Sequence, residues 1–414
     1  MALSLKKKKR RPDPRTSQDI RAERLRYREA ASAPMDLPFL LLTLLLTAMG
    51  LVMVLSASFP SAYYEEEGNG AYFFIRQCIF AALGLVVMFI LSRMNYQSLR
   101  NTGKGLMIFA LMLLVLVIIP GNPIAITENG ATRWLGIKGT ILRGQPSEVA
   151  KIAVVVFFSA TISKKREKMQ TWKHGIWPYV AVLLIISGLM MLEPHLSGTI
   201  LIVCTGLVLM IVGGIKGWLV PVGIGGVAAA GALYVYLVLN GKVKYGAGRV
   251  ISWLNPFNTD YYRSIGWQSA QCQIAIGSGG LLGVGLGKGR QKFLYLPEEH
   301  NDCIFAVICE ELGLVGACVV MLVFALLILR GFWIALHARD RFGALLVVGF
   351  MTLTGLQTFL NIAVVTGLVP TTGISLPFFS YGGTALLCQL AEMGIVLSVS
   401  RQMPAPENGQ EALS

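Results

Sequence analysis

Long apolar runs recur along this chain of 414 residues and constrain its fold more than any other feature. About ten of them reach the roughly 20 residues that a helix needs to cross ~30 Å of hydrocarbon. Hydrophobic residues make up 54% of the chain and charged residues only 14%, whereas soluble domains carry ~25% charged residues. The sequence therefore predicts an all-α, polytopic membrane protein with about ten transmembrane helices. Their centres lie near Leu45, Leu85, Met112, Val155, Leu183, Val208, Ala228, Val315, Gly349 and Leu390.

The distribution of basic residues predicts how these helices are oriented. The formal net charge is +14, and Lys and Arg gather in residues 1–35 and in every second connection between apolar runs. Because cytoplasmic connections carry an excess of Lys and Arg, both termini are expected in the cytoplasm. A patch for anionic lipids and a nucleic-acid arm are the alternatives for the basic tail. The later basic positions are Arg93, Arg100, Lys104, Lys164, Lys165, Arg166, Lys168, Lys173, Lys216, Arg330, Arg339 and Arg341.

Three regions follow from this pattern. Residues 1–35 form a basic cytoplasmic tail whose composition favours disorder, residues 36–400 form the membrane domain, and residues 401–414 form a second cytoplasmic tail. The first apolar run, 37–55, is longer than the ~7–15 residue core of a signal peptide, so we expect it to be retained. Seven cysteines, most of them inside apolar runs, predict neither a disulfide framework nor a zinc site.

One outward connection, about residues 240–302, is far longer than the others, and loops of more than ~15 residues inside compact folds usually bind or catalyse. Its positive charge lies on the side where the other connections have little, which favours an anionic partner such as a lipid diphosphate or phospholipid head groups. Solvated surface charge is the alternative. Its glycine-rich part, 283–292, does not match a nucleotide-binding P-loop, but such a loop can close over a phosphate group. The basic residues are Lys242, Lys244, Arg249, Arg263, Lys288, Arg290 and Lys292.

The connection ends in a cluster of ionisable residues directly before an apolar run. The cluster contains Glu298, Glu299, His300 and Asp302. In a chain poor in acids, such a group at the water–lipid boundary is typical of chemistry on a lipid-linked substrate. Asp302 is the first candidate in this cluster for a residue that takes part in the chemistry. A carboxylate that caps the following helix is the alternative for Asp302.

A second polar segment begins an apolar run at Gln145-Pro-Ser147-Glu148 and continues to Lys151. Proline suits the first turn of a helix, and Glu148 and Lys151, three residues apart, share one helix face. Ionisable groups inside a span are costly and usually serve function. A purely structural pair that fixes the helix position is the alternative.

Residues 367–385 indicate irregular backbone between two apolar runs. They contain two prolines and four glycines. Lipid does not tolerate non-helical backbone unless the protein buries it or it lines a wet cavity. The sequence therefore predicts a cavity at this segment, opposite the segment that carries Asp302.

Taken together, these motifs resemble the SEDS family of bacterial shape, elongation, division and sporulation proteins. The resemblance spans about residues 36–400. Ser375 and Leu376, before Pro377, are more similar to the division members than to the elongation members. A match to the sporulation members is the remaining alternative. The motifs are Gln145-Pro-Ser-Glu148, Leu296-Pro-Glu-Glu-His-Asn-Asp302, and Asn361 to Ala385 with its Ser380-Tyr-Gly-Gly-Thr core.

The resemblance implies a ten-helix peptidoglycan glycosyltransferase that polymerises lipid II on the outer face of the bacterial cytoplasmic membrane, at the septum during division. Its implied partners are lipid II, a class B penicillin-binding protein, other division proteins and membrane lipids, but no nucleic acid. Asp302 matches the family's proposed catalytic aspartate and would accept the proton of the acceptor sugar's 4-hydroxyl. With no obvious enzyme nucleophile, transfer is expected to invert the anomeric carbon. The expected cavity lining is Gln145, Ser147, Pro377, Ser380, Tyr381, Gly382 and Gly383.

A departing diphosphate needs positive charge, worth on the order of several kcal/mol in a dry site. The sequence does not determine a cofactor. Glu298, Glu299 and Asp302 would suit a divalent cation such as Mg²⁺ or Mn²⁺, but their spacing matches no specific metal-binding motif. The residues expected to bind the diphosphate are Arg133, Lys288, Arg290, Lys292 and His300, with Lys151 as a further candidate.

The chain departs from the family pattern at two places. His195, in Glu193-Pro-His-Leu-Ser-Gly-Thr199, replaces an acid that is common in relatives, and Cys303 replaces phenylalanine. Two rival functions belong to other classes: a flippase or transporter of lipid-linked precursors, and a non-catalytic division scaffold. The absence of paired broken helices in the two halves of the sequence disfavours the transporter.

Overall fold

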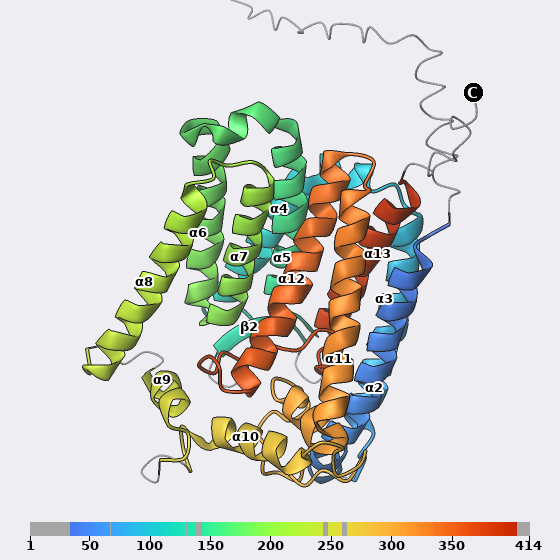
Figure 1. The fold of residues 1–414 in the computed structure, drawn as a ribbon, viewed down its shortest axis with the longest axis vertical. Helices are drawn as coiled ribbons and strands as arrows, with labels where there is room; N and C mark the ends of the chain where they lie inside the picture. The colour runs from blue at the N-terminus through green and yellow to red at the C-terminus, as the bar shows by residue number, and fades with distance from the viewer. Residues whose placement is uncertain are drawn as a thin grey trace, which may run out of the picture.

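The computed structural model describes residues 34–66, 68–128, 131–137, 143–242, 247–258 and 263–403. Most of the two predicted tails, and Lys244, lie outside the described residues. Long helices run side by side as a bundle (Figure 1). They are α2 (Leu37–Glu65), α3 (Tyr72–Arg93), α4 (Gln97–Ile118), α5 (Pro146–Lys164), α6 (Trp177–Leu192), α7 (Leu196–Val212), α8 (Leu219–Leu239), α11 (Ile304–Leu336), α12 (Arg341–Val365) and α13 (Gly383–Arg401).

The helices match the predicted apolar runs, because each of the predicted centres falls inside one of them. Within the described residues, eight helices are long and apolar enough to cross a membrane. The apolar helix α7 is shorter, with 17 residues, and α8, with 21 residues, is not among the eight. The polytopic α-helical class is thus confirmed, while the count of ten remains a prediction.

The beginning of α2 and the end of α13 lie at the same end of the bundle. The backbone N–H of Asp36 donates a hydrogen bond to Ser400 Oγ at 3.2 Å. Asp36 also caps α2, accepting from Phe39 N at 2.9 Å, and pairs with Arg330 of α11, whose Nη2 lies 2.7 Å from Asp36 Oδ2. We call the opposite end, where α9 (Ala247–Leu254) and α10 (Trp267–Gly279) lie in Figure 1, the outer end.

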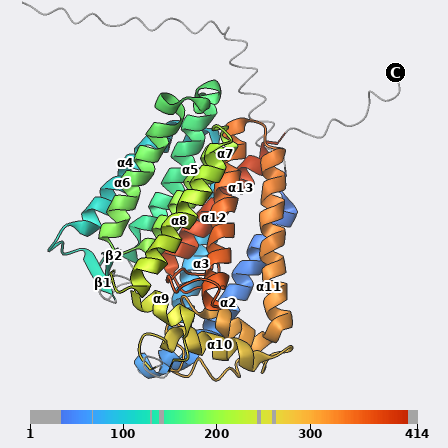
Figure 2. The same cartoon turned by 60° about the vertical axis from the view of Figure 1, so that its left-hand side comes forward.

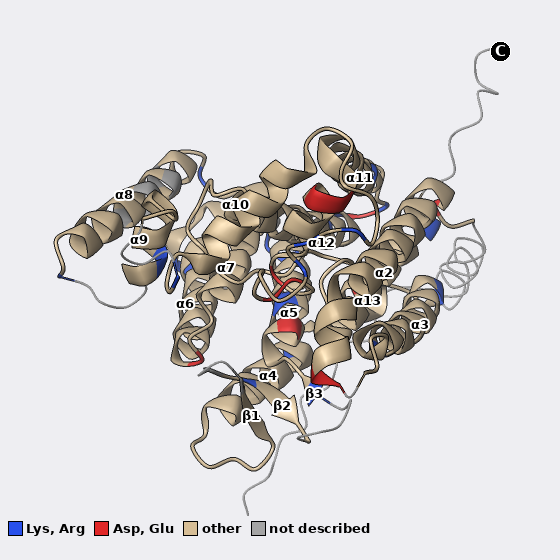
Figure 3. Cartoon of the chain, turned by 90° about the horizontal axis from the view of Figure 1, so that it is seen from below, with Lys and Arg blue, Asp and Glu red and all other residues tan. Residues whose placement is uncertain are grey.

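Three helices form the centre of the bundle. In their most apolar stretches, 67% of α5, 67% of α12 and 72% of α13 is buried, compared with 22% of α3. The central helices therefore bury most of their residues inside the bundle, while most residues of α3 are exposed or only partly buried. Figure 3, a view onto the outer end, shows α5, α12 and α13 enclosed by the other helices and α8 at the edge.

The outer end carries structure that the apolar pattern did not predict. The long connection contains α9 and α10, and α10 lies across the outer end of the bundle (Figure 1). The connection between α4 and α5 forms an antiparallel sheet of β1 (Ala125–Glu128), β2 (Ala131–Gly136) and β3 (Arg143–Gly144) in the order β1-β2-β3. This sheet lies beside the outer end of α4 (Figure 2).

The start of α11 is packed backbone to backbone against the glycine-rich connection. A Cβ at Gly279 would overlap the carbonyl oxygen of Cys309, and one at Gly283 would overlap that of Glu311. The Glu310 carboxylate accepts hydrogen bonds from the amides of residues 290 and 291, and the Glu311 carboxylate from those of residues 287 and 289. The first turns of α11, directly after Asp302, are therefore fixed by this connection.

Candidate active site

A cavity of about 470 Å³ opens toward the outer end of the bundle, with Asp302 in its lining. Its walls come from β2, the first turns of α5 and α7, the segment before α11, and residues 371–386. The predicted cavity at the irregular segment is therefore confirmed. Of the predicted site residues, Arg133, Gln145, Glu148, Lys151, Asp302, Pro377, Ser380, Tyr381 and Gly382 line it.

The segment that carries Asp302 is held through three successive main-chain carbonyls. Asn361 Nδ2 donates to the Asp302 carbonyl at 2.9 Å. Ser380 Oγ donates to the Asn301 carbonyl at 2.7 Å, and the backbone N–H of Tyr381 donates to the His300 carbonyl at 2.8 Å. Since Asn361 also binds the Ile374 carbonyl at 2.6 Å, α12 and the irregular segment together position Asp302.

The surroundings of Asp302 make it a weaker acid than an ordinary aspartic acid. Burial, followed by the negative charge of Glu298, raises the pKa of Asp302 to about 6, against the opposing effects of Arg133, Arg249 and His300. A base with a pKa close to the working pH combines a large ionised fraction with a strong drive to accept a proton. Asp302 therefore fits the role of a general base near neutral pH.

Glycine at position 373 leaves room for the Asp302 carboxylate. Gly373 has a φ of +68°, and a Cβ there would lie 3.1 Å from Asp302 Oδ2. A side chain would be strained at this φ and would also press on the carboxylate. The irregular segment therefore contributes space as well as hydrogen bonds to the site.

Three cationic side chains line the same cavity as Asp302. Arg133 of β2 reaches across to the turn between α6 and α7, where its Nε donates to the Glu193 carbonyl at 3.2 Å and its Nη2 to the Pro194 carbonyl. Arg249 comes from α9. Lys151 pairs with Glu148 at 2.7 Å, so the predicted pair exists and borders the cavity.

The other predicted cations lie elsewhere. Lys292 is buried, 2.6 Å from Glu311 Oε1 and 3.0 Å from Ser56 Oγ. Lys288 and Arg290 are exposed and do not line the cavity. Because the amides of the glycine-rich connection bind Glu310 and Glu311, they are engaged with carboxylates. The expectation that this connection closes over a phosphate group stays a prediction.

Three predicted residues, His300, Gly383 and Ser147, do not line the main cavity. His300 stacks on the ring of Phe73 at 4.6 Å between centroids. Together with Gly383, Arg76 and Arg143, it lines a smaller neighbouring cavity of about 230 Å³. Ser147 is buried and lies outside the lining of either cavity.

The pKa values of Glu193 and His195, in the segment that departs from the family pattern, are both shifted toward the neutral forms. Burial raises the pKa of Glu193 to about 8, although Arg133 opposes this shift. Burial, followed by the charges of Arg133 and Lys151, lowers the pKa of His195 to about 3. His195 lines the main cavity and Glu193 does not. His195 therefore adds a neutral imidazole to the cavity lining.

Residues 36–404 match the sequence profile of the cell cycle protein family of FtsW, RodA and SpoVE. The chain belongs to this family. It is 40% identical over 381 residues to a probable peptidoglycan glycosyltransferase FtsW of Trichlorobacter lovleyi, covering 92% of this chain and 97% of the relative. It is 38% identical over 367 residues to the stage V sporulation protein E of Bacillus subtilis, covering 88% and 97%.

A chain in a solved structure has the same fold as this protein. That chain belongs to a structure that describes the coordination of polymerization and crosslinking by a peptidoglycan synthase complex. Its TM-score to this protein is 0.72, and its sequence identity is 27%. The match covers 89% of this chain and 98% of that chain. The family resemblance inferred from the three motifs is therefore confirmed.

Several polar residues at the site were not predicted from the sequence. Gln357 binds Lys151 Nζ at 3.2 Å and the Ser375 carbonyl at 3.1 Å. Gln77 of α3 donates to the Ser380 carbonyl and accepts from the Gly382 amide, each at 3.2 Å. Their signal was present, because polar side chains within apolar spans are costly and usually functional. The residues not predicted are Gln77, Gln357 and Gln389, while Arg249 was named only as a basic residue of the long connection and Asn361 only as the start of a motif.

Proposed function

We propose that this protein is a peptidoglycan glycosyltransferase that polymerises lipid II on the outer face of the bacterial cytoplasmic membrane. The observation that carries the proposal is the cavity at the outer end, in which the Asp302 carboxyl, with its raised pKa, is surrounded by cationic side chains. The names of the family relatives support the reaction class.

The reaction requires one bond to form and another to break. The hydroxyl oxygen of the acceptor sugar attacks the anomeric carbon of the donor, and the bond from that carbon to the diphosphate oxygen breaks with its electron pair. Ionised Asp302 accepts the hydroxyl proton. Arg133, Arg249 and Lys151 stabilise the charge that develops on the diphosphate. A single displacement inverts the anomeric carbon.

A divalent cation is a further part of the proposal. Magnesium is commonly held by one or two carboxylates together with substrate phosphates, and Glu298 and Asp302 both line the cavity. These two side chains therefore suit Mg²⁺ or Mn²⁺ beside a bound diphosphate. Such a cation would supply additional charge stabilisation for the leaving group.

We assign the protein to septal wall synthesis during division, in association with a class B penicillin-binding protein that crosslinks the strands and with other division proteins. The FtsW relative supports the division role, and the structural neighbour, a chain of a peptidoglycan synthase complex, supports the association. The nearly equal identity of the sporulation relative makes sporulation the second assignment.

The test is strand formation from purified lipid II by the wild-type protein, with and without the crosslinking partner, beside Asp302→Asn. Polymer from the wild type and none from a folded Asp302→Asn is the expected result. Equal polymer from both would remove Asp302 from the chemistry. If neither forms polymer with partner present, transbilayer movement of lipid II in vesicles would support a flippase. Rescue of division by Asp302→Asn would support a scaffold.

A further inference from the structure

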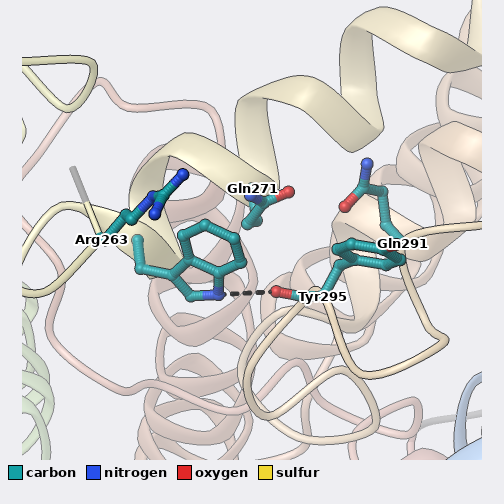
Figure 4. Close-up of a pocket in the computed structure, with 5 residues that line it drawn as sticks. Arg263, Gln271, Gln291 and Tyr295 are labelled. Carbon is teal, nitrogen blue, oxygen red and sulfur yellow. Dashed lines mark hydrogen bonds between the residues drawn. The ribbon is translucent and has the colours of Figure 1, made fainter. Parts of the chain in front are cut away.

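A groove of about 650 Å³ lies at the outer end, lined by a set of residues distinct from the Asp302 cavity. Its lining combines two aromatic rings, two primary amides and one guanidinium group (Figure 4). The lining residues are Arg263, Trp267, Gln271, Gln291 and Tyr295.

The groove is built on a fixed framework. Trp267 Nε1 donates a hydrogen bond to the main-chain carbonyl of Tyr295 at 2.8 Å (Figure 4). This bond joins the first turn of α10 to the segment that leads to Asp302. The backbone N–H of Gln291 is held by the Glu310 carboxylate. These bonds hold the Trp267 ring and the backbone of Tyr295 and Gln291 in place before any ligand arrives.

Two groups in the groove have unused binding capacity. The Tyr295 side chain is 55% exposed, so a large part of its ring surface faces solvent. In the described part of the chain, Gln291 Oε1 is buried without a hydrogen-bond partner. A buried acceptor without a partner is costly, which favours a rotation of the Gln291 side chain toward a ligand that carries hydroxyl or amide N–H groups.

The chemistry of the groove selects among ligands. Among the described residues, no carboxylate lines the groove, which disfavours a cation, and a single guanidinium is little charge for a polyphosphate. Exposed aromatic faces pack against apolar C–H surfaces, and primary amides both donate and accept hydrogen bonds. A neutral chain with alternating C–H faces, hydroxyls and amides, which is a glycan, matches this lining.

The groove also lies next to the Asp302 cavity. Gln268 lines that cavity, while its neighbour Trp267 lines the groove. Gln268 Nε2 also contacts Cys303 Sγ at 3.3 Å, beside Asp302. A polymer that leaves the cavity past the first turn of α10 therefore arrives at the groove.

We propose that this groove is a subsite for the glycan strand that has already been made. The proposal rests on the proposed polymerase function. The groove retains the strand between successive additions, so that the same strand is extended many times before it is released. It acts on the release of the strand and leaves the addition of each sugar unit to the Asp302 cavity.

The first test is binding of a lipid-free, uncrosslinked peptidoglycan oligosaccharide to the full-length protein in nanodiscs, measured by calorimetry. Tyr295→Ala should weaken binding about tenfold, the factor that corresponds to ~1.4 kcal/mol. The Trp267 bond ends on the Tyr295 backbone, so this substitution leaves it in place. Tyr295→Phe should bind as the wild type does. Phe293→Ala removes a ring of similar exposure, 50%, outside the groove, and should have no effect.

The second test compares strand length with the initial rate of lipid II consumption. Tyr295→Ala should shorten the strands several-fold at an unchanged initial rate, while Phe293→Ala should leave both unchanged. Wild-type binding of the oligosaccharide without any polymerisation would count against the proposed function and leave the subsite standing. Unchanged oligosaccharide binding and strand length in Tyr295→Ala would overturn the subsite. If Tyr295→Ala lost only the stimulation by the crosslinking partner, the subsite would also be overturned, because the groove would then be a contact surface for that protein.

Discussion

The Nδ2 atom of Asn361 lies 2.9 Å from the Asp302 carbonyl oxygen and 2.6 Å from the Ile374 carbonyl oxygen. One buried side chain of α12 therefore joins the segment that carries the base to the irregular segment opposite. Asn361→Leu removes both hydrogen bonds and leaves two carbonyls unpaired, each at a cost of ~1–3 kcal/mol. We expect polymerisation to fall about 100-fold, the effect of a ~1 Å misplacement of a catalytic group.

The matched control is Thr358→Val on the same helix. Thr358 Oγ1 donates only to the Thr354 carbonyl of its own helix among the bonds of the described residues, so the variant should retain nearly full activity. Activity should be measured with lipid II at saturation, and the amount of folded protein by size-exclusion chromatography in detergent. An active Asn361→Leu would show that Asp302 is positioned by other contacts.

The pH dependence of the reaction follows from the surroundings of Asp302. The base acts only when ionised, and its pKa is raised to about 6. The initial rate should therefore fall as pH drops through about 6 and level off above it. Glu298→Gln removes the second cause of the raised pKa, so the acid limb should move to lower pH. An acid limb that stays in place in Glu298→Gln would contradict this assignment.

Lys292 is predicted to stabilise the fold and not to bind substrate. Lys292→Met leaves Glu311 buried without its counter-charge, and breaking such a pair costs about 3–5 kcal/mol. The thermal unfolding temperature should fall markedly, as measured by the fluorescence of a thiol-reactive dye. Lys288→Met, at an exposed position nearby, should unfold as the wild type does. A raised KM for lipid II with normal stability in Lys292→Met would restore the diphosphate role.

Arg249 is predicted to bind the leaving diphosphate. It lines the cavity from α9, and its charge acts on Asp302. Losing a charge-assisted hydrogen bond costs ~1.5–3 kcal/mol, so Arg249→Gln should raise the KM for lipid II about 10- to 100-fold. Lys242→Gln, which changes an exposed charge of the same connection outside the cavity, should leave KM unchanged. Equal effects of both substitutions would indicate general attraction to anionic lipid.

The sequence predicted those parts of the site that local pattern determines. The helices follow from apolar runs, and the cavity beside residues 371–382 follows from prolines and glycines that exclude a helix. The role of Lys292 did not follow, because no local pattern pairs it with Glu311, 19 residues further along the chain, or with Ser56, 236 residues before it. The helix α9 has only eight residues, too few for an apolar period to stand out in a long polar connection.

The glycine-rich connection and the first turns of α11 have a wider consequence. Their backbones touch at Gly279 and Gly283, and buried carboxylates of α11 bind the amides of the connection. Such a unit should open cooperatively, with amide protons that exchange together. Since Asp302 precedes this unit directly, the unit holds the Asp302 segment from the side of α11, while Asn361 and Ser380 hold it from α12 and the irregular segment. A change in bilayer thickness that alters the tilt of α12 should therefore move Asp302 only as far as the glycine-rich connection yields.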